Sequence, residues 1–342
     1  MAPNILITGA AGYIGGSVLA DLLSSSSNAI REANLIAVVR TKEQSQSVSE
    51  LGVNVIQLDL SDDPGVREAV LEHKIDIIIH TASSMVPQLA SSLIQALGER
   101  RRVSGTDAYF IHTSVTSLFS KEAGWPYGEI RDNDPILGKQ KAIEQPSPVT
   151  LTDIIVAEEA KKQDVKSVNV VVPYVYGRGT GQWRKLSVNI PGFVRTSITH
   201  KTVYKFDVEG KPPAAHISDL VALYNLLLEK CLLKEPIPTG EHGYYFAMAH
   251  RAPWWEVMNR LAKALYARGL VSGPEVYTWP SDAMAAEYLQ LPELYIRAMG
   301  TSTGDLVPVN AYKLGWKPKW TLEMFLDSMD DEIQAVLDLD KG

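Results

Sequence analysis

Short apolar segments alternate with longer amphipathic segments over the first half of the chain. The apolar segments are rich in Ile, Val and Leu, and most lack the regular exchange of apolar and polar residues seen in half-exposed strands. Such runs predict strands that are covered on both faces of a parallel sheet. We predict strands at residues 5–7, 35–39, 53–58, 75–79, 108–113, 169–172 and 244–248.

The segments between these strands carry apolar residues three or four positions apart, which is the spacing of an amphipathic helix. Clear examples are residues 14–22, 86–97 and 152–162, and the acidic residues before Pro64 are typical of a helix start. Five successive strand–helix units predict an α/β fold with a doubly wound parallel Rossmann sheet of about seven strands. In such a sheet the ligand lies outside the carboxyl ends of the strands.

The pattern becomes less regular after residue 177, and the chain of 342 residues is longer than one hydrophobic core usually covers. We therefore predict two parts. Residues 1–177 and parts of 214–250 form the Rossmann domain, and residues 178–213 and 251–342 form a smaller substrate lobe. Further elements expected in this half are a hairpin around Glu209-Gly210 and helices that begin near Ser218, Trp254 and Thr321.

Three glycines follow the first strand at a spacing of three, namely Gly9, Gly12 and Gly15. In a dinucleotide-binding turn the first glycine permits a tight turn and the second lets the backbone approach a pyrophosphate. The third lets the helix pack closely on the strand, and the helix N-terminus faces the phosphate charge. The position between a buried strand and a helix favours this interpretation over an ordinary strand–helix turn.

The end of the second strand indicates which dinucleotide binds. A site for NAD normally has an acidic residue there for the ribose 2′-hydroxyl, whereas an arginine suits the 2′-phosphate of NADP. No Asp or Glu occurs between Ile36 and Lys42, and Arg40 follows the strand. We predict NADP as the cofactor, the alternative being that Arg40 is a solvated charge at a strand end. Asp59 and Leu60, after the third strand, are expected beside the adenine.

Composition excludes several other classes of function. The hydrophobic fraction of 45%, the charged fraction of 21% and the net charge of −7 are typical of a soluble globular protein without a nucleic-acid footprint. No apolar run reaches 18 residues and the N-terminus lacks a basic segment, so we expect a cytoplasmic protein without a membrane span. The single Cys231 predicts packing rather than a disulfide, and the seven scattered histidines predict no metal site.

Several motifs together resemble the extended short-chain dehydrogenase/reductase family, whose members include NAD-dependent epimerases and dehydratases. They are Thr8-Gly9 through Gly15, Asp59-Leu60, His80-Thr-Ala82, Pro173-Tyr-Val-Tyr-Gly177, His216-Ile-Ser-Asp219 and Leu314-Gly-Trp-Lys-Pro318. The resemblance covers nearly the whole chain. The stretch Tyr176-Gly-Arg-Gly-Thr-Gly181, with Ser187 and Ile190-Pro191, is most similar to poorly characterised fungal NAD(P)-binding proteins among the atypical members.

The resemblance implies a set of cofactor-binding residues. The pyrophosphate is expected against the turn residues, the ribose against the end of the fourth strand, and the nicotinamide against the end of the sixth. The corresponding residues are Gly9, Ala11, Gly12, Tyr13 and Ile14, then Ala82 and Ser83, then Pro173.

The chain departs from the family at its catalytic dyad. Ordinary members have a Tyr and a Lys at Y-x-x-x-K spacing on the helix before the sixth strand, but no Tyr in this chain is followed four residues later by Lys. Between Pro146 and Ile155 the only side chains with proton chemistry are those of Ser147, Thr150, Thr152 and Asp153. The site is therefore that of an atypical member.

We predict Ser114, at the end of the fifth strand, as the group that orients a substrate carbonyl, although Val115 also fits that position. Tyr174 is the predicted proton donor, with Tyr176 and His216 as alternatives and packing at a strand end as the structural interpretation. His80 is expected to be structural.

The predicted function is an NADP(H)-dependent oxidoreductase, a reductase of a small-molecule carbonyl or imine, acting as a monomer or homodimer. The alternative is a non-redox NAD(P)-binding protein. It would be a redox sensor that binds a protein partner, or an isomerase or cyclase that uses the same pocket.

Overall fold

Seven parallel strands form the central sheet of the computed structural model, which describes residues 2–339. Their order is β11-β7-β5-β4-β1-β2-β3, and every ladder in this sheet is parallel. The strands are β1 Asn4–Thr8, β2 Asn34–Val39, β3 Asn54–Gln57, β4 Ile75–His80, β5 Tyr109–Val115, β7 Lys166–Val172 and β11 Tyr244–Phe246. The seven strands predicted from the apolar runs are thus confirmed.

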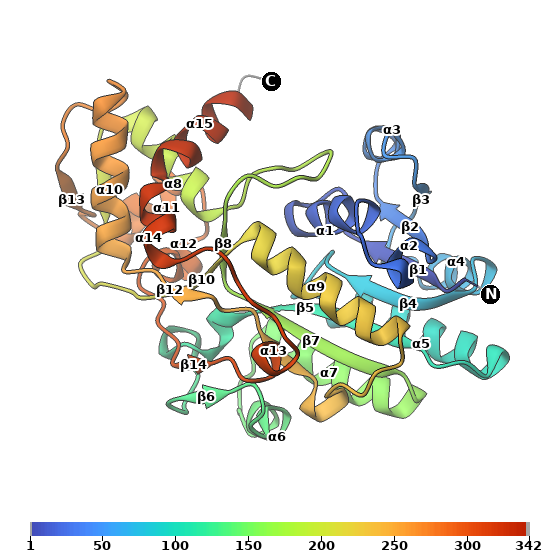
Figure 1. The fold of residues 1–342 in the computed structure, drawn as a ribbon. Helices are drawn as coiled ribbons and strands as arrows, with labels where there is room; N and C mark the ends of the chain where they lie inside the picture. The colour runs from blue at the N-terminus through green and yellow to red at the C-terminus, as the bar shows by residue number, and fades with distance from the viewer. Residues whose placement is uncertain (1, 340–342) are drawn as a thin grey trace.

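Helices cover both faces of this sheet (Figure 1). Side chains alternate along β1, so that Ile5 and Ile7 pack on one face and Leu6 on the other. The first face carries α1 Tyr13–Leu23, α2 Asn28–Arg31, α3 Lys42–Ser49 and α9 Ile217–Leu232. The second carries α4 Asp63–Glu72, α5 Pro87–Ser104 and α7 Pro148–Gln163. This two-sided arrangement is the doubly wound Rossmann fold that the sequence predicts.

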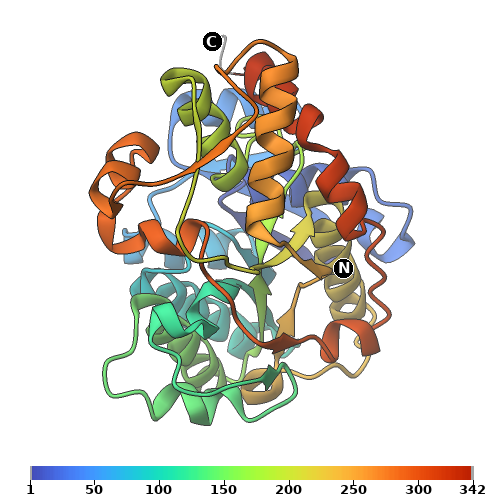
Figure 2. The ribbon, with the colours of Figure 1, turned by 90° about the vertical axis from the view of Figure 1, so that its left-hand side faces the viewer.

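A second lobe, whose helices face the viewer in the upper part of Figure 2, has its own apolar cluster. This cluster contains Phe193, Trp254, Leu261, Phe325 and Ile333. Its helices are α8 Asn189–His200, α10 Trp254–Ala267, α11 Asp282–Leu289, α12 Glu293–Ile296, α14 Leu322–Asp327 and α15 Met329–Leu339. Its strands are β8 Tyr174–Tyr176, β9 Val203–Lys205, β10 Pro213–His216, β12 His250–Arg251 and β13 Val276–Thr278.

Short elements complete the described chain. They are β6 Ile130–Arg131, α6 Ile136–Lys141, β14 Leu306–Val307 and α13 Asn310–Lys313, together with single 3-10 turns at Thr116–Phe119, Lys121–Ala123, Gly240–His242 and Arg297–Met299. β6 pairs in parallel with β14. No helix within residues 2–339 is both long and apolar enough to cross a membrane.

Two local predictions in the second half were wrong. The stretch around Glu209-Gly210 is not a hairpin, because β9 pairs with β13 while β10 pairs with β8 and β12. The single helix expected from Thr321 through Val336 is interrupted at Ser328, whose hydroxyl donates to the carbonyl of Phe325, so that α14 and α15 are separate. Pairing with distant strands explains the first difference, whereas the second comes with a local side-chain contact.

One buried carboxylate connects two of the sequence motifs across the lobe boundary. Asp219, in the first turn of α9, accepts hydrogen bonds from the backbone of Lys319 and Trp320, both at 2.9 Å. Its carbonyl accepts the indole N–H of Trp316 at 2.7 Å. The motif His216–Asp219 and the motif Leu314–Pro318 therefore form one contact, which joins the chain before α14 to the Rossmann domain.

Candidate dinucleotide-binding site

The glycine turn between β1 and α1 is packed against the end of β4. Gly9 has a φ of +73°, and the N–H of Gly12 donates to its carbonyl at 2.7 Å. A Cβ on Gly9 or on Gly15 would overlap the hydroxyl of Thr81. These two glycines are therefore required by the turn itself and by the close approach of α1.

Gly12 differs from the other two glycines. Its φ is −79°, and a Cβ there would meet only the carbonyl of Gly9, at 3.0 Å, with no other atom within 4 Å. No side chain within the described chain caps the N-terminus of α1, which begins at Tyr13. The first backbone N–H groups of this helix therefore have no side-chain acceptor, which leaves them available to a phosphate.

Arg40 is exposed at the carboxyl end of β2, next to the start of α3. Its backbone N–H donates to the side chain of Gln44 at 3.0 Å, in the capping box that begins α3. Asp59 lies near Arg40. Two hydrogen bonds from Ser61 hold the pKa of Asp59 below its usual value, and the charge of Arg40 lowers it further. Arg40 thus stands at the strand end where an adenosine ribose lies in a Rossmann site.

The end of β4 borders the same turn. The Thr81 hydroxyl donates to the carbonyl of Thr8 at 2.8 Å, and Ser83 Oγ accepts the N–H of Met85 at 3.1 Å. Beside them His80 is fully buried and shares a 2.8 Å hydrogen bond with the hydroxyl of Thr8. Burial lowers the pKa of His80 to about 4, so the ring is neutral and joins β4 to β1.

The predicted cofactor residues thus line one edge of the sheet. Ala82 and Ser83 follow β4, Pro173 separates β7 from β8, and Asp59 and Leu60 follow β3. Leu60 is buried in the core beneath, whereas Asp59 is exposed. These positions form the carboxyl edge at which parallel sheets bind nucleotides.

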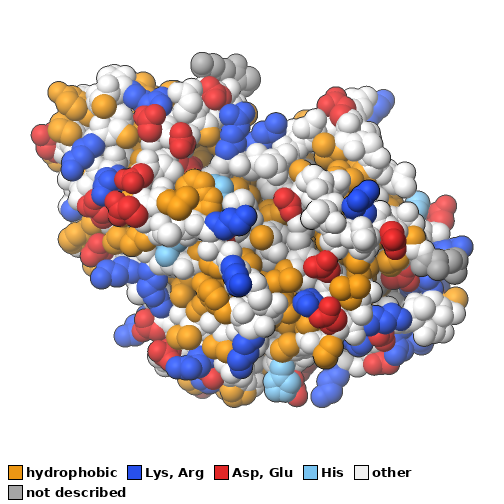
Figure 3. Space-filling model, in the orientation of Figure 1, with side chains coloured by type: hydrophobic (Ala, Val, Ile, Leu, Met, Phe, Trp, Pro, Cys, Tyr) orange, Lys and Arg blue, Asp and Glu red, His pale blue; other side chains and the backbone are white. Residues whose placement is uncertain are grey.

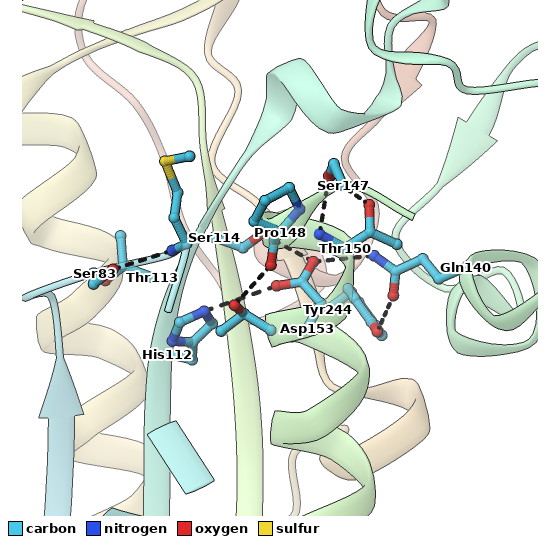
Figure 4. Close-up of polar contacts among 12 residues, drawn as sticks. Ser83, His112, Thr113, Ser114, Gln140, Ser147, Pro148, Thr150, Asp153 and Tyr244 are labelled. Atoms are coloured by element: carbon cyan, nitrogen blue, oxygen red, sulfur yellow. Dashed lines mark hydrogen bonds and ion pairs between the residues drawn. The ribbon is translucent and has the colours of Figure 1, made fainter. Parts of the chain in front are cut away.

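Ser114 lies at the end of β5 in a buried polar cluster (Figure 4). Its hydroxyl donates to Oδ2 of Asp153 at 2.9 Å, and the amide of Gln140 donates to the same oxygen at 3.0 Å. The Tyr244 hydroxyl in turn donates to the carbonyl oxygen of Gln140 at 2.7 Å. Burial raises the pKa of Asp153 to about 7, against the lowering effect of both hydrogen bonds. This carboxyl group can therefore exchange a proton near neutral pH.

Asp153 lies on α7, the helix that holds the catalytic dyad in ordinary members of the family that the sequence resembles. The other hydroxyl groups of this segment are engaged with their own helix. Ser147 accepts the N–H of Thr150 at 3.2 Å, and Thr152 donates to the carbonyl of Pro148 at 2.9 Å. Among the four candidates of this segment, only Asp153 forms a hydrogen bond with a residue of β5.

Two neutral histidines extend this cluster under the sheet edge. Nε2 of His112 lies 3.8 Å from Oδ1 of Asp153, and the His112 ring stacks on that of His80 at 5.5 Å. Burial, aided by His80, holds the pKa of His112 well below its usual value. His112 thus places an uncharged ring beside Asp153, so the ionised form of the carboxyl group stays costly in this buried site.

Tyr174, predicted as the proton donor, points into the second lobe. Its hydroxyl donates to the carbonyl of Ala298, and its ring meets Trp254 edge-on at 5.4 Å. Burial raises the pKa of this phenol well above its usual value. The hydroxyl of Ser114 contacts Asp153 instead, so the structure does not bring the two predicted catalytic residues together. A role for Tyr174 in proton transfer stays a prediction.

The two alternative proton donors, Tyr176 and His216, also form hydrogen bonds within the protein. The Tyr176 hydroxyl shares a 2.9 Å hydrogen bond with Nε2 of His250. Nδ1 of His216 accepts the N–H of Ser218 at 3.2 Å and so caps α9, while its ring stacks on Trp320 at 3.9 Å. Burial lowers the pKa of His216 to about 4. These contacts give both residues a structural role between the lobes.

Sequence reasoning named Asp153 without placing it in the site. One feature of the sequence could have indicated it. Asp153 is the only ionisable residue between Pro146 and Glu158, where the other side chains are apolar or carry hydroxyl groups. What the sequence could not supply was the register between α7 and β5 that brings Asp153 to Ser114.

Comparison with known proteins agrees with this architecture. Residues 5–107 match the model of the NAD dependent epimerase/dehydratase family. A UDP-glucose 4-epimerase of Drosophila melanogaster is 30% identical over 121 residues, which are 33% of this chain and 31% of that protein. An uncharacterised protein of Schizosaccharomyces pombe is 25% identical over 92% of this chain and 95% of its own length.

Solved structures extend the likeness in fold to the whole chain. The UDP-glucose 4-epimerase of Thermotoga maritima, solved with UDP-glucose, has a TM-score of 0.64 at 16% identity and covers 98% of this chain and 99% of its own. Vestitone reductase of alfalfa, Medicago sativa, has a TM-score of 0.62 at 18% identity and covers 98% of both chains. Residues 5–107 thus match the NAD dependent epimerase/dehydratase family model, and the whole chain shares the fold of these solved structures.

Proposed function

We propose that this protein is an NADP(H)-dependent oxidoreductase that reduces a carbonyl or imine group of a small molecule. The main observation for the proposal is that the N-terminus of α1, which follows Gly12, has no side-chain cap. It lies at the carboxyl edge of a doubly wound sheet. Backbone N–H groups in this position bind a dinucleotide pyrophosphate without any side chain. Solved structures of this fold include a reductase, vestitone reductase, as well as epimerases, so the fold is compatible with the proposal.

The choice of NADP rests on Arg40. Its guanidinium has no hydrogen bond or ion pair with a side chain of the described residues, apart from the electrostatic effect of Asp59. Thr41 caps α3 immediately afterwards, and its capping box with Gln44 fixes the backbone beside Arg40. An exposed arginine without a side-chain partner is suited to a 2′-phosphate.

When bound, the nicotinamide cofactor supplies the hydride, and the chain must deliver a proton to the substrate oxygen or nitrogen. We propose that Ser114 donates that proton and that Asp153 in its protonated form, 2.9 Å away, then donates its own proton to the Ser114 oxygen, which leaves Asp153 as a carboxylate. The pKa of Asp153 at about 7 lets the carboxyl group hold this proton at neutral pH. Tyr174, as predicted from the sequence, is the second candidate, and it requires its hydroxyl to leave the carbonyl of Ala298.

The test is consumption of NADPH over a panel of aldehydes, ketones and imines, with the Gly12→Val variant as a control that lacks the cofactor site. We expect oxidation of NADPH with at least one class of substrate and none with the variant. Tight binding of NADPH without oxidation by any compound would instead favour the non-redox alternative, in which the dinucleotide has a structural or sensing role.

A further inference from the structure

The loop that begins the second lobe lies directly on the glycine turn. We define this covering loop as residues 177–188, between β8 and α8, and Figure 1 shows it reaching towards α1. The Tyr13 hydroxyl donates to the carbonyl of Gly177 at 2.7 Å, and the N–H of Thr180 donates to the Ser17 hydroxyl at 3.2 Å. The first turns of α1 are thus bound to a segment more than 160 residues away in sequence.

The glycines of the covering loop are explained by this contact. A Cβ on Gly181 would lie 2.8 Å from the backbone of Gly16, and one on Gly179 would lie 2.9 Å from the Ser17 hydroxyl and 3.0 Å from the ring of Tyr13. The stretch Arg178-Gly-Thr-Gly181 is therefore shaped to approach α1 closely. This close approach fixes the position of the residues that follow.

A backbone hydrogen bond of Arg184 holds this residue beside the glycine turn. Its N–H donates to the carbonyl of Ala11 at 3.3 Å, one residue before Gly12. Its side chain is exposed, and no hydrogen bond or ion pair of the guanidinium is found within residues 2–339. By contrast, Arg178 at the other end of the loop forms an ion pair with Asp338 at 3.5 Å.

The turn has no cation of its own. Residues 1–30 contain neither Lys nor Arg, and α1 carries Asp21. A dinucleotide pyrophosphate has two negative charges, whereas a helix N-terminus contributes only about half a positive charge. In the space-filling view a notch separates the two lobes, and Lys and Arg side chains lie on its second-lobe side (Figure 3). A counter-charge from the covering loop would complete the site.

We propose that Arg184 binds the pyrophosphate of the dinucleotide, so that the covering loop of the second lobe forms part of the cofactor site. This inference rests on the proposed function, because it requires a dinucleotide at the turn. It assigns two arginines to two different phosphates. Arg40 binds the 2′-phosphate, which NADP has and NAD lacks. Arg184 binds the pyrophosphate, which both dinucleotides contain.

Calorimetric binding of NADPH, NADH and adenosine 2′-monophosphate to four proteins separates these assignments. The proteins are the wild type, Arg184→Ala, Arg40→Ala and, as a matched control on the same loop, Arg178→Ala. We expect Arg184→Ala to weaken NADPH and NADH by the same factor, about 10- to 100-fold for a lost charge-assisted hydrogen bond, and to leave adenosine 2′-monophosphate unaffected. Arg40→Ala should weaken NADPH and adenosine 2′-monophosphate and leave NADH unaffected, and Arg178→Ala should change none of the three affinities.

Each failure has its own signature. Unchanged affinity of Arg184→Ala for both dinucleotides overturns the inference. A loss of affinity for NADPH alone also overturns it, because Arg184 would then bind the 2′-phosphate together with Arg40. A wild type that binds neither dinucleotide overturns the proposed function itself. Because the Arg184 side chain is exposed and unpaired, an unchanged melting temperature in this variant verifies that the fold is intact.

Discussion

Ser114 and Asp153 form a buried hydrogen-bonded pair between the end of β5 and helix α7, with 2.9 Å between the serine hydroxyl and the aspartate oxygen. Asp153 lies on the helix to which the resemblance in sequence assigns the tyrosine and lysine of ordinary short-chain dehydrogenase/reductases. The carboxyl group is surrounded by the side chains of Ser114, His112 and Gln140, with Tyr244 behind the glutamine. The most direct consequences of the pair concern proton transfer and the pH dependence of stability.

Replacing Asp153 should change how stability depends on pH. Burial raises the pKa of Asp153 to about 7, compared with about 4 in an unfolded chain. Between these pH values the folded protein binds more protons than the unfolded chain, so this group's contribution to the free energy of unfolding falls as pH rises. The effect is at most about 4 kcal/mol, since each pKa unit corresponds to 1.36 kcal/mol.

Asp153→Asn removes this titration and retains a side chain of the same shape. Urea unfolding from pH 4 to pH 8 should therefore show wild-type stability declining relative to the variant through this range. Glu332, whose pKa burial also raises to about 7, is present in both proteins and cancels in the comparison. Parallel stability curves would mean that Asp153 has no such shift.

Ser114→Ala should lower the turnover number by about 10²- to 10⁴-fold, the usual effect of losing a general acid, while NADPH affinity stays within about twofold. Strand β4 lies between the strand of Ser114 and β1, which carries the glycine turn, so loss of the hydroxyl should not disturb the pyrophosphate site. Turnover at saturating substrate and the dissociation constant of NADPH are the two measurements. An equal loss in both would indicate a structural role.

The Tyr174→Phe variant tests whether Tyr174 or Ser114 donates the proton. If the phenol only packs in the second lobe, removal of its hydrogen bond to Ala298 should cost about 1 kcal/mol of stability and leave turnover nearly unchanged. We expect this outcome because the hydroxyl is engaged away from Ser114. A drop in turnover of 100-fold or more, with stability maintained, would establish Tyr174 as the donor.

Arg40→Ala should remove most of the preference for NADPH over NADH, a change of about 1 to 3 kcal/mol in the difference between their binding free energies. The exposed side chain makes few other contacts, so folding should be unaffected. Isothermal titration of both dinucleotides tests this. Equal affinities for NADPH and NADH in the wild type would refute the choice of NADP.

Gly12→Val should abolish dinucleotide binding while the protein remains folded. Gly12 has a negative φ that other residues adopt, and its only close neighbour is the carbonyl of Gly9, so the valine side chain would occupy the space proposed for the pyrophosphate. Gly128→Val is a suitable control, because a Cβ at Gly128 has no neighbour within 4 Å. Normal binding by the Gly12 variant would place the cofactor elsewhere.

The features predicted correctly are those that depend on short stretches of chain. Apolar runs such as residues 75–79 form strands because only a sheet covered on both faces buries them, and the spacing from Gly9 to Gly15 fixes the turn locally. The features that were missed depend on distant partners. The contact between Ser114 and Asp153 requires α7 to pack on β5, and β9 pairs with β13 rather than with its neighbour β10.

The covering loop shows the same limit. In the sequence the pattern becomes less regular after β8, as in an irregular connection. In the structure these positions require glycine, because Gly16 and Tyr13 of α1 lie against them. Sequence alone gives no distance between residue 181 and residue 16. The position of Arg184 beside Ala11 therefore became visible only in the folded chain.

The central claim is that the chain uses NADPH as a hydride donor, and single-turnover oxidation of NADPH tests it most directly. The enzyme is mixed with stoichiometric NADPH and each compound of the aldehyde, ketone and imine panel, and NADPH absorbance and reduced product are followed together. The account predicts one equivalent of reduced product per NADPH consumed, a slower reaction with NADH, and no reaction with Gly12→Val. Binding of NADPH with no oxidation by any compound in the panel would contradict it.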